Sequence, residues 1–216
     1  MTKTAKKKLK SLIVILVEVA LVVVIIFSAI SLFKNSYYES IFVSGSSMDP
    51  TFVGTGEKVD YGIIDGHDYA KRHLKRYQIV TTHFPGESKE ASYKIKRVLV
   101  LPGETFKIYE NNLYLKKGNK WSEPLDMPFS RNLTNDDGTP LIKSFRDGDE
   151  ITLSSSEYFL AGDNWVHSYD SFYVGPIDYS CLTGVLVEMQ GKCTLEDGKV
   201  KTLFPEAPRY FLGVDY

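Results

Sequence analysis

Two stretches of the chain contain the residue types of a nucleophile and of a general base. Residues 44–51 read SGSSMDPT and directly follow the apolar run 41–43, which we expect to be a strand. A serine hydroxyl attacks a carbonyl group efficiently only when an adjacent base removes its proton. Ser, Gly, Asp and Pro are also the usual residues of surface turns, so this stretch alone does not separate a nucleophile loop from a turn.

The candidate base lies in the second stretch, residues 92–101, which reads SYKIKRVLVL and is typical of a strand. With a period of two, Lys96 shares one face with Val98 and Val100. Burial on that face would disfavour the ammonium form and lower the pKa of Lys96 from about 10.4, leaving an amine that can accept the serine proton. The strand by itself favours a simpler interpretation, in which Lys94 and Lys96 extend into water.

A third stretch, residues 161–175, reads AGDNWVHSYDSFYVG. Its Gly-Asp-Asn sequence at 162–164 is a turn signature and by itself weak evidence of function. Three stretches in this order, after an apolar N-terminal segment, resemble the pattern of bacterial type I signal peptidases. These are membrane-bound serine proteases that remove signal peptides from exported proteins. The resemblance rests on residues 45–51, 96–103, 162–164 and 168–171, and it is weakest over 116–150.

The resemblance implies a catalytic role for several residues of this chain. Ser47 corresponds to the nucleophile and Lys96 to the general base. The expected supporting residues are Gly45 beside an oxyanion hole formed by the Ser47 N–H, Ser168 as the residue that orients the lysine, Arg97 and Asp163 as a structural ion pair, and Asp170. An extended signal peptide, cut after a small-x-small motif, is expected to lie along the adjacent strands. Its binding surface would include Phe42, Val43, Met48 and Ile95.

Two positions depart from the family pattern. Phe172 stands where the family usually has an arginine, and Ser46 stands where single-anchor members often have an aspartate. Both changes concern neighbours of the catalytic residues and leave Ser47 and Lys96 in place. They keep open the alternative of an inactive relative, a membrane-anchored chaperone or binding module.

The N-terminus predicts a membrane anchor. An apolar run at 12–33 follows a segment with lysines at positions 3, 6, 7, 8 and 10. At about 1.5 Å per residue this run can cross the roughly 30 Å core of a bilayer. We expect a bacterial cell-membrane protein with residues 1–10 in the cytoplasm, a transmembrane helix at 11–33 and residues 34–216 outside. A cleavable signal peptide ending near 29–31 is the alternative.

The remaining sequence predicts a mainly β fold. Short runs rich in Val, Ile, Tyr and Phe alternate with Gly, Pro, Asn and Asp, which is typical of an antiparallel sheet. The expected strands are 41–43, 76–80, 92–101, 105–109, 113–115, 157–160 and 184–189. Residues 104–156 are expected to form an inserted subdomain, irregular over 116–149, and the role of 194–216 is left open.

Composition limits the partners and cofactors. The chain has 216 residues and a net charge of −1, which does not favour a nucleic-acid partner. The spacing of Cys181 and Cys193 neither establishes a disulfide nor indicates a metal site, and no cofactor is expected. The expected partners are signal peptides of secreted precursors and the lipid bilayer, with the protein-export channel as a further candidate.

Two other catalytic classes compete with the Ser-Lys interpretation. A Ser-His-Asp hydrolase would need a histidine base, and His167, beside Ser168, is the only histidine near one of the three stretches. The chain lacks the G-x-S-x-G pattern of a nucleophile elbow, which argues against that class. A self-cleaving repressor would share the Ser-Lys chemistry, but it would not need a membrane anchor.

Overall fold

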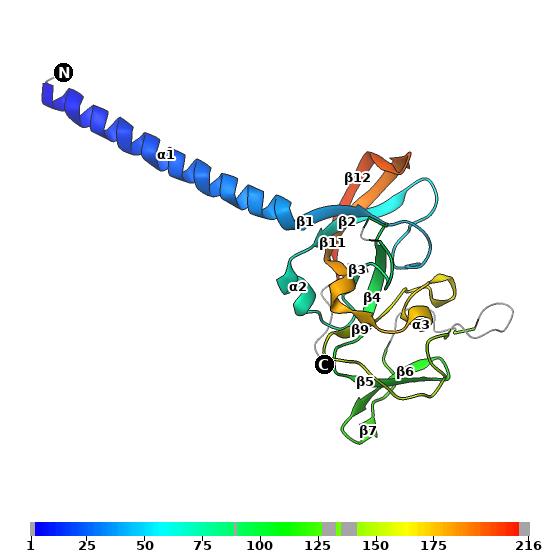
Figure 1. Ribbon diagram of the computed structural model, residues 1–216. Coiled ribbons are helices and arrows are strands. Elements are labelled where there is room, and N and C mark those ends of the chain that lie inside the picture. The colour runs from blue at the N-terminus through cyan, green and yellow to red at the C-terminus, as the bar shows by residue number, and fades with distance from the viewer. Residues whose placement is uncertain (1–2, 89, 127–132, 135–141, 212–216) are drawn as a thin grey trace. The chain divides into compact units, whose positions relative to one another are not determined.

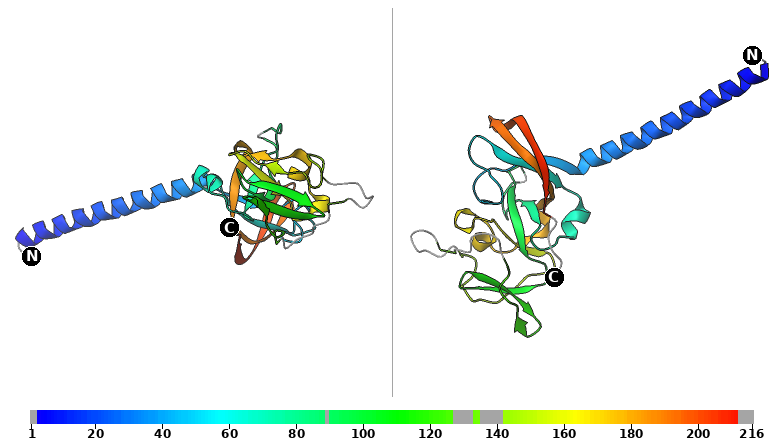
Figure 2. Two further views of the ribbon diagram at one scale, coloured as in Figure 1. Left: turned by 90° about the horizontal axis from the view of Figure 1, so that it is seen from below. Right: turned by 180° about the vertical axis from the view of Figure 1, so that it is seen from behind.

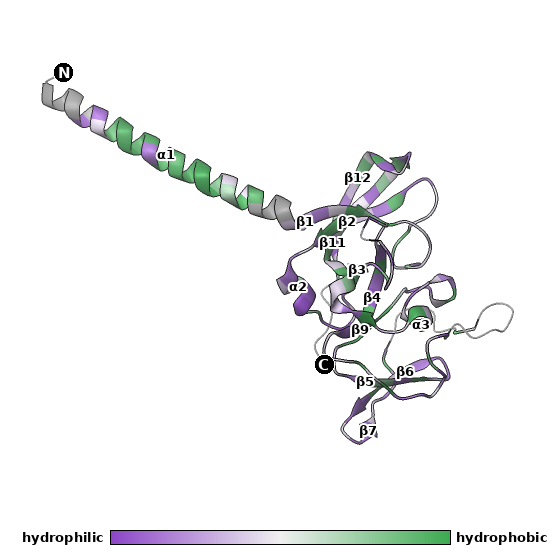
Figure 3. Ribbon diagram, in the orientation of Figure 1, coloured by the Kyte–Doolittle hydropathy of each residue, from purple (hydrophilic) through white to green (hydrophobic). Residues whose placement is uncertain are grey.

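The computed structural model describes residues 3–88, 90–126, 133–134 and 142–211 (Figure 1). The chain divides into two compact units, residues 1–38 and 39–216. The first unit is almost entirely the helix α1 (Lys3–Tyr37). Its segment Lys10–Leu32 is long and apolar enough to cross a membrane, and its side chains are exposed within the unit. Figure 3 shows this apolar character along the middle of α1, where exposed aliphatic side chains need a non-aqueous environment.

The second unit is built on an antiparallel sheet that carries the candidate catalytic residues. Its strands, in spatial order, are β1 (Tyr38–Phe42), β2 (Val59–Asp65), β11 (Leu182–Glu196), β3 (Ile79–Thr82), β4 (Lys94–Val100), β9 (Glu157–Ala161) and β10 (Ile177–Asp178). The strand β12 (Lys199–Tyr210) pairs only with β11, and the two form a hairpin that projects from the unit (Figures 1 and 2). The mainly β, antiparallel fold expected from the sequence is therefore confirmed.

A smaller sheet forms the opposite end of this unit from the β12 hairpin (Figure 1). Its strand order is β7 (Lys120–Trp121), β6 (Asn112–Lys117), β5 (Thr105–Tyr109) and β8 (Ile151–Thr152). These strands fall within the expected inserted segment 104–156, of which 127–132 and 135–141 lie outside the described residues. The strands expected at 105–109 and 113–115 are present as the hairpin of β5 and β6. Glu110 and Asn111 form its turn, with φ of 48° and 62°, as is typical of a two-residue hairpin loop.

Two strand predictions for the larger sheet need correction. The strand expected at 76–80 begins only at Ile79, because Tyr77 has φ of 68°, a conformation that interrupts a strand. The strand expected at 184–189 is the middle of the longer β11, and β2, β10 and β12 were not expected from the sequence. Short helical segments complete the unit: α2 (Asp68–Arg72), α3 (Ser171–Val174) and 3₁₀ turns at Trp165–His167 and Tyr179–Cys181.

An aromatic cluster joins the two sheets and contains Phe172, which stands where an arginine was expected. Phe172 is 2% exposed. Its ring centroid lies 5.1 Å from that of Phe159 and 4.8 Å from that of Trp165. Close-packed rings leave no water-filled space for a cation, so Phe172 contributes to stability as a core residue.

We therefore expect Phe172→Arg to lower the free energy of unfolding by about 3 kcal/mol or more, because it buries a guanidinium among aromatic rings. Phe172→Leu, the matched control, should cost only about 1.5 kcal/mol. Denaturant unfolding of the detergent-solubilised chain measures both. An arginine variant as stable as the parent would show that this position accepts a cation.

Candidate active site

The segment after β1 forms a tight loop, here called the nucleophile loop (residues 44–53), that holds Ser47. Gly45 turns the chain with φ of +86°, a region that favours glycine, and its N–H donates to the Gly54 carbonyl at 2.8 Å. Met48 and Phe52 are buried and connected by a 3.0 Å backbone hydrogen bond. These two apolar anchors fix the loop against the sheet, while the Ser47 side chain remains partly accessible.

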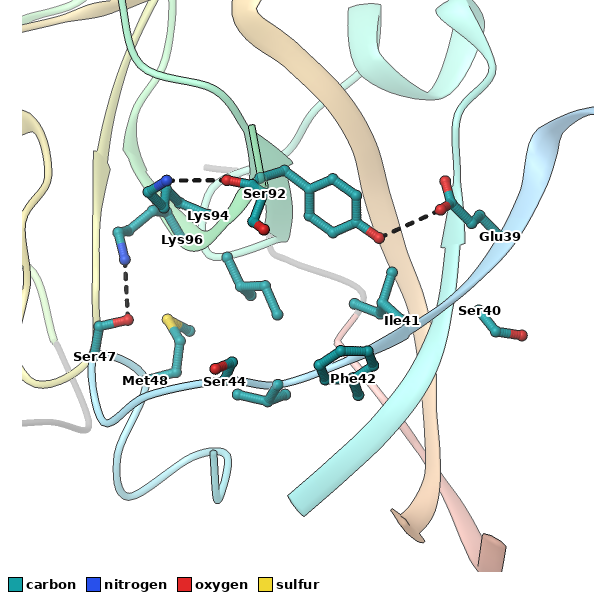
Figure 4. A pocket seen from close by; sticks show the side chains of 13 residues that line it. Glu39, Ser40, Ile41, Phe42, Ser44, Ser47, Met48, Ser92, Lys94 and Lys96 are labelled. Atoms are coloured by element: carbon teal, nitrogen blue, oxygen red, sulfur yellow. Dashed lines mark hydrogen bonds between the residues drawn. The ribbon is translucent and has the colours of Figure 1, made fainter. Parts of the chain in front are cut away.

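Ser47 and Lys96, the expected nucleophile and base, lie in direct contact. The Lys96 Nζ donates a hydrogen bond to Ser47 Oγ at 3.0 Å (Figure 4). Lys96 is only 3% exposed, and burial lowers its pKa from 10.5 to about 8. The carboxylates of Asp170 and Asp163 raise this pKa and Lys94 lowers it further, but these effects are smaller than that of burial. A neutral amine is therefore accessible near neutral pH.

The two lysines of β4 occupy different environments, although a period of two places them on one face. The Lys94 Nζ turns back to the Ser92 carbonyl at 2.9 Å and to Glu87 at 3.2 Å, and its side chain is 36% exposed. Lys96 lies deeper, where β4 is buried on both faces from Ile95 to Val100. The interpretation that both amines extend into water is wrong for Lys96, and Lys94 is only partly exposed, with its amine held by Ser92 and Glu87.

The turn at 162–164 supports the nucleophile loop from the other side. Asn164 donates its backbone N–H to the Ser47 carbonyl at 3.0 Å and its side-chain amide to the Ser46 carbonyl at 3.2 Å. A Cβ at Gly162 would lie 2.3 Å from the Ser47 carbonyl oxygen. Only glycine lets the two segments approach this closely.

The expected ion pair between Arg97 and Asp163 is present and buried. Arg97 binds the Asp163 carboxylate with two hydrogen bonds, at 2.7 Å from Nε and 2.6 Å from Nη2. Thr51 of the nucleophile loop donates to the same carboxylate at 2.5 Å. The pair thus connects β4, the 162–164 turn and the nucleophile loop through one bidentate contact.

Asp170 lies beneath the site and is satisfied without the arginine that the family usually has. Its carboxylate accepts the backbone N–H groups of Gly162 at 2.9 Å and Phe172 at 3.1 Å. Burial raises the pKa of Asp170, and the Ser168 hydroxyl, these N–H groups and Lys96 lower it to a smaller extent. The backbone therefore supplies the stabilisation that a side-chain cation would otherwise give.

Ser168, which was expected to orient the lysine, is buried, with 5% of its surface exposed. Its hydroxyl oxygen would lie only 2.3 Å from a Cβ at Gly162. Among the described residues its hydroxyl makes no hydrogen bond of regular geometry, to Lys96 or to any other group. Its proximity lowers the pKa of Asp170. The orienting role of Ser168 stays a prediction.

A cleft of about 430 Å³ opens beside the Ser47–Lys96 pair (Figure 4). One wall consists of residues 39–44 with Ser47 and Met48, and the other consists of residues 92–96. The four residues expected to bind substrate, Phe42, Val43, Met48 and Ile95, all line it. The Tyr93 hydroxyl lies 3.5 Å from the Glu39 carboxylate and bridges the two walls at the end away from Ser47.

Other candidate groups take no part in this arrangement. The His167 side chain is exposed, and no hydrogen bond of its ring is found among the described residues. Cys181 and Cys193 are free thiols. The roles of Thr51 and Asn164 were not predicted, because the sequence of a turn does not indicate which distant residue each of its side chains will contact.

Comparison with known proteins gives matches to one family of peptidases. Residues 14–189 match the protein family described as "Signal peptidase, peptidase S26". Signal peptidase I T of Bacillus subtilis (strain 168) is 31% identical over 171 residues, which cover 78% of this chain and 79% of that protein. Signal peptidase I V of the same strain is 29% identical over 161 residues, 73% of this chain and 88% of that protein. A crystal structure of a signal peptidase I from Enterococcus faecalis V583 is 25% identical, with a TM-score of 0.37. The alignment covers 53% of this chain and 97% of the chain in that crystal structure.

The depressed pKa of Lys96 predicts the pH dependence of any reaction that uses its free amine. Below a pKa of about 8 the amine is protonated, so kcat/KM should rise about tenfold per pH unit and level off above that value. Initial rates of precursor cleavage between about pH 6 and pH 10 measure this profile. A rate that stays constant over that range would rule out Lys96 as the titrating base.

The close approach at Gly162 predicts the effect of a single methyl group there. Gly162→Ala should displace the nucleophile loop and lower kcat by about tenfold or more, since a misplacement of about 1 Å can cost a hundredfold. Gly56→Ala is the control for backbone strain, because its φ of +92° disfavours alanine while its Cβ would meet nothing within 4 Å, so this variant adds strain without a clash. Equal kcat values for the two variants would contradict the prediction.

Proposed function

Since the chain belongs to the peptidase S26 family of signal peptidases, it is a serine endopeptidase that removes signal peptides, and we propose that Ser47 and Lys96 perform the cleavage. The observation that carries the proposal is the 3.0 Å hydrogen bond between the Lys96 amine and the Ser47 hydroxyl. A serine hydroxyl paired with a buried amine is the Ser-Lys variant of the catalytic-triad logic.

Neutral Lys96 acts first as a general base. It removes the proton from Ser47 Oγ as that oxygen attacks the scissile carbonyl carbon, forming a tetrahedral intermediate and an ammonium group. The ammonium then gives its proton to the leaving amine, and the C–N bond breaks. The signal peptide stays attached to Ser47 as an ester, which water, deprotonated by the same amine, hydrolyses.

The negative oxygen of the intermediate needs a hydrogen-bond donor. Among the described residues, the structure gives the Ser47 backbone N–H no acceptor, although the Ser47 carbonyl is held by Asn164. This N–H is therefore available as an oxyanion donor, beside the space left by Gly45. Loss of one such donor typically costs about 3 kcal/mol of transition-state stabilisation.

The ammonium form of Lys96 also needs stabilisation while it exists. Asp170 and Asp163 provide it, since both carboxylates favour the protonated amine. We propose that Asp170 supports the site in this way, and that Arg97 with Asp163 keeps the loop and β4 in register.

The cleft suits an extended peptide. On one side, β1 is the terminal strand of the sheet, so one of its edges is unpaired within the described sheet. On the other side, Lys94–Lys96 pair with β3, whereas β9 pairs with β4 only from Arg97 onward. A signal peptide can add a strand between these edges, with alternate side chains directed at Val43, Met48 and Ile95. Such a narrow apolar floor admits small residues, which supports cleavage after small-x-small motifs.

The apolar segment of α1 fits membrane association. We further propose a single-pass topology with the lysine-rich start in the cytoplasm and residues 34–216 outside, since lysines hold their flank on the cytoplasmic side. The bilayer would then hold the apolar segment of a precursor near the cleft. Contact with the protein-export channel would supply precursors as they emerge. The inactive alternative rested on Phe172 and Ser46. Core packing of Phe172 accounts for the missing arginine, the Ser46 carbonyl is held by Asn164, and no observation favours the alternative.

We expect Ser47→Ala and Lys96→Met each to lower precursor cleavage by at least about a thousandfold, because each removes one half of the nucleophile–base pair. Cleavage of a purified precursor by the full chain in detergent, followed on gels, measures the loss. Ser155→Ala and Lys120→Met, two exposed positions, are the matched controls and should cleave like the parent.

Undiminished cleavage by either Ser47→Ala or Lys96→Met would remove the Ser-Lys mechanism. A parent chain that fails to cleave precursors at any pH would instead support the inactive alternative.

A further inference from the structure

A buried carboxylate outside the catalytic pair lies beneath the nucleophile loop. Asp60 of β2 is 1% exposed. It accepts the Val53 backbone N–H at 2.6 Å, the Lys192 amine at 3.1 Å and the Arg209 guanidinium at 3.0 Å. Lys192 lies directly opposite Asp60 on β11, whereas Arg209 reaches it from β12, one strand further away.

The C-terminal end of β12 contacts the same part of the loop. Arg209 donates a second hydrogen bond, from Nη1 to the Thr51 carbonyl, at 3.4 Å. The ring of Phe211 packs edge-on against that of Phe52, with centroids 5.1 Å apart. Residues 51–53 are therefore held between Asp60 and residues 209–211, at and just after the end of β12.

Asp60 also closes both ends of the nucleophile loop through its backbone. Its N–H donates to the Val53 carbonyl at 2.8 Å, and its carbonyl accepts the Val43 N–H at 2.8 Å. From Thr51 the connection continues to the active site, since its hydroxyl binds Asp163, the partner of Arg97. Any shift of 51–53 is thus transmitted to Ser47 at one end and to β4 at the other.

The contact between Asp60 and residues 51–53 depends in part on the positive charge of Arg209. A buried carboxylate is costly unless cations and hydrogen bonds compensate it, and Asp60 has two cations and one N–H. Arginine has a planar fork that can bind Asp60 and the Thr51 carbonyl together, whereas a lysine provides a single point charge. Arg209 therefore adds a second connection between the carboxylate and the loop, beside the direct hydrogen bond from the Val53 N–H.

We propose that Asp60 and Arg209 are positioning residues, which fix residues 51–53 and thereby hold Ser47 within hydrogen-bond distance of Lys96. Neither residue touches the reacting atoms, and the inference rests on the proposed Ser-Lys function. Arg209 lies beyond residues 14–189, the part of the chain that matches the peptidase family. The hairpin of β11 and β12 thus contributes one of the two positioning residues, Arg209.

The test compares Arg209→Met with the parent, using the full chain in detergent and a purified precursor. We expect kcat to fall about tenfold or more, because the nucleophile moves away from its base. KM should stay within about twofold, since the cleft walls do not contain Arg209. The ascending limb of the pH profile should keep its position, because the burial of Lys96 is unchanged.

Lys201→Met is the matched control, as Lys201 lies on the same strand and forms an ion pair with the exposed Glu196, away from the nucleophile loop. It should keep the parent kcat. A double-mutant cycle adds a second readout: Asp60→Asn with Arg209→Met should lower kcat by less than the product of the two single effects, because both changes break the Asp60–Arg209 contact. If Asp60→Asn does not fold, the single Arg209 variant decides the question.

A parent-like kcat for Arg209→Met would overturn the inference, as would a lowered melting temperature with kcat unchanged, which indicates a purely structural contact. A fall in kcat shared equally by Lys201→Met would overturn it as well. Ser47→Ala, assayed alongside, separates this failure from that of the proposed function. If that variant is inactive, only the positioning role is lost, and if it cleaves, the Ser-Lys mechanism itself is wrong.

Discussion

The rest of the structure depends on keeping the Lys96 amine buried away from water and next to the Ser47 hydroxyl. A shift of the Lys96 pKa from 10.5 to about 8 means that the fold disfavours the ammonium form. At about 1.4 kcal/mol per pKa unit, this costs the folded chain about 3 kcal/mol. The whole cost applies below about pH 8, where Lys96 is protonated in the folded and in the unfolded chain. It decreases between about pH 8 and 10.5 and is absent above 10.5, where Lys96 is neutral in both. The packing around the site must therefore offset the free-energy cost of burying the Lys96 charge.

That packing comes from segments far apart in the sequence. β4 supplies Lys96, the loop after β1 supplies Ser47, and the 162–164 turn buttresses the loop through the Ser47 carbonyl. The ion pair of Arg97 and Asp163 joins these three segments, and each of these two buried charges compensates the other. Asp170 tolerates burial because backbone N–H groups reach it, which is why an apolar Phe172 can follow without leaving the carboxylate unsatisfied.

The nucleophile loop is consequently clamped from two sides. On the side of the active site the clamp is Asn164 with Asp163, and on the opposite side it is Asp60 with the end of β12. Loops usually carry function on a rigid scaffold, and here the scaffold includes a strand that follows the part of the chain shared with the peptidase family. A hairpin whose β12 side chains are all exposed still contributes to the centre, through Arg209 at its base.

The sequence by itself determined the chemistry and the fold class. Serine after a strand, lysine in an apolar strand and the Gly-Asp-Asn turn occur in an order that is specific as a set, and alternating apolar runs predict antiparallel strands because the side-chain period of a strand is two. It could not determine which of two lysines on one face is buried, since that depends on how deep each lies in the sheet. Nor could it show β2 and β12, the roles of Thr51 and Asn164, or the contact of Asp60 with Arg209. Those were decided only by tertiary structure, because hydrogen-bond partners separated by more than a hundred residues leave no mark on local periodicity.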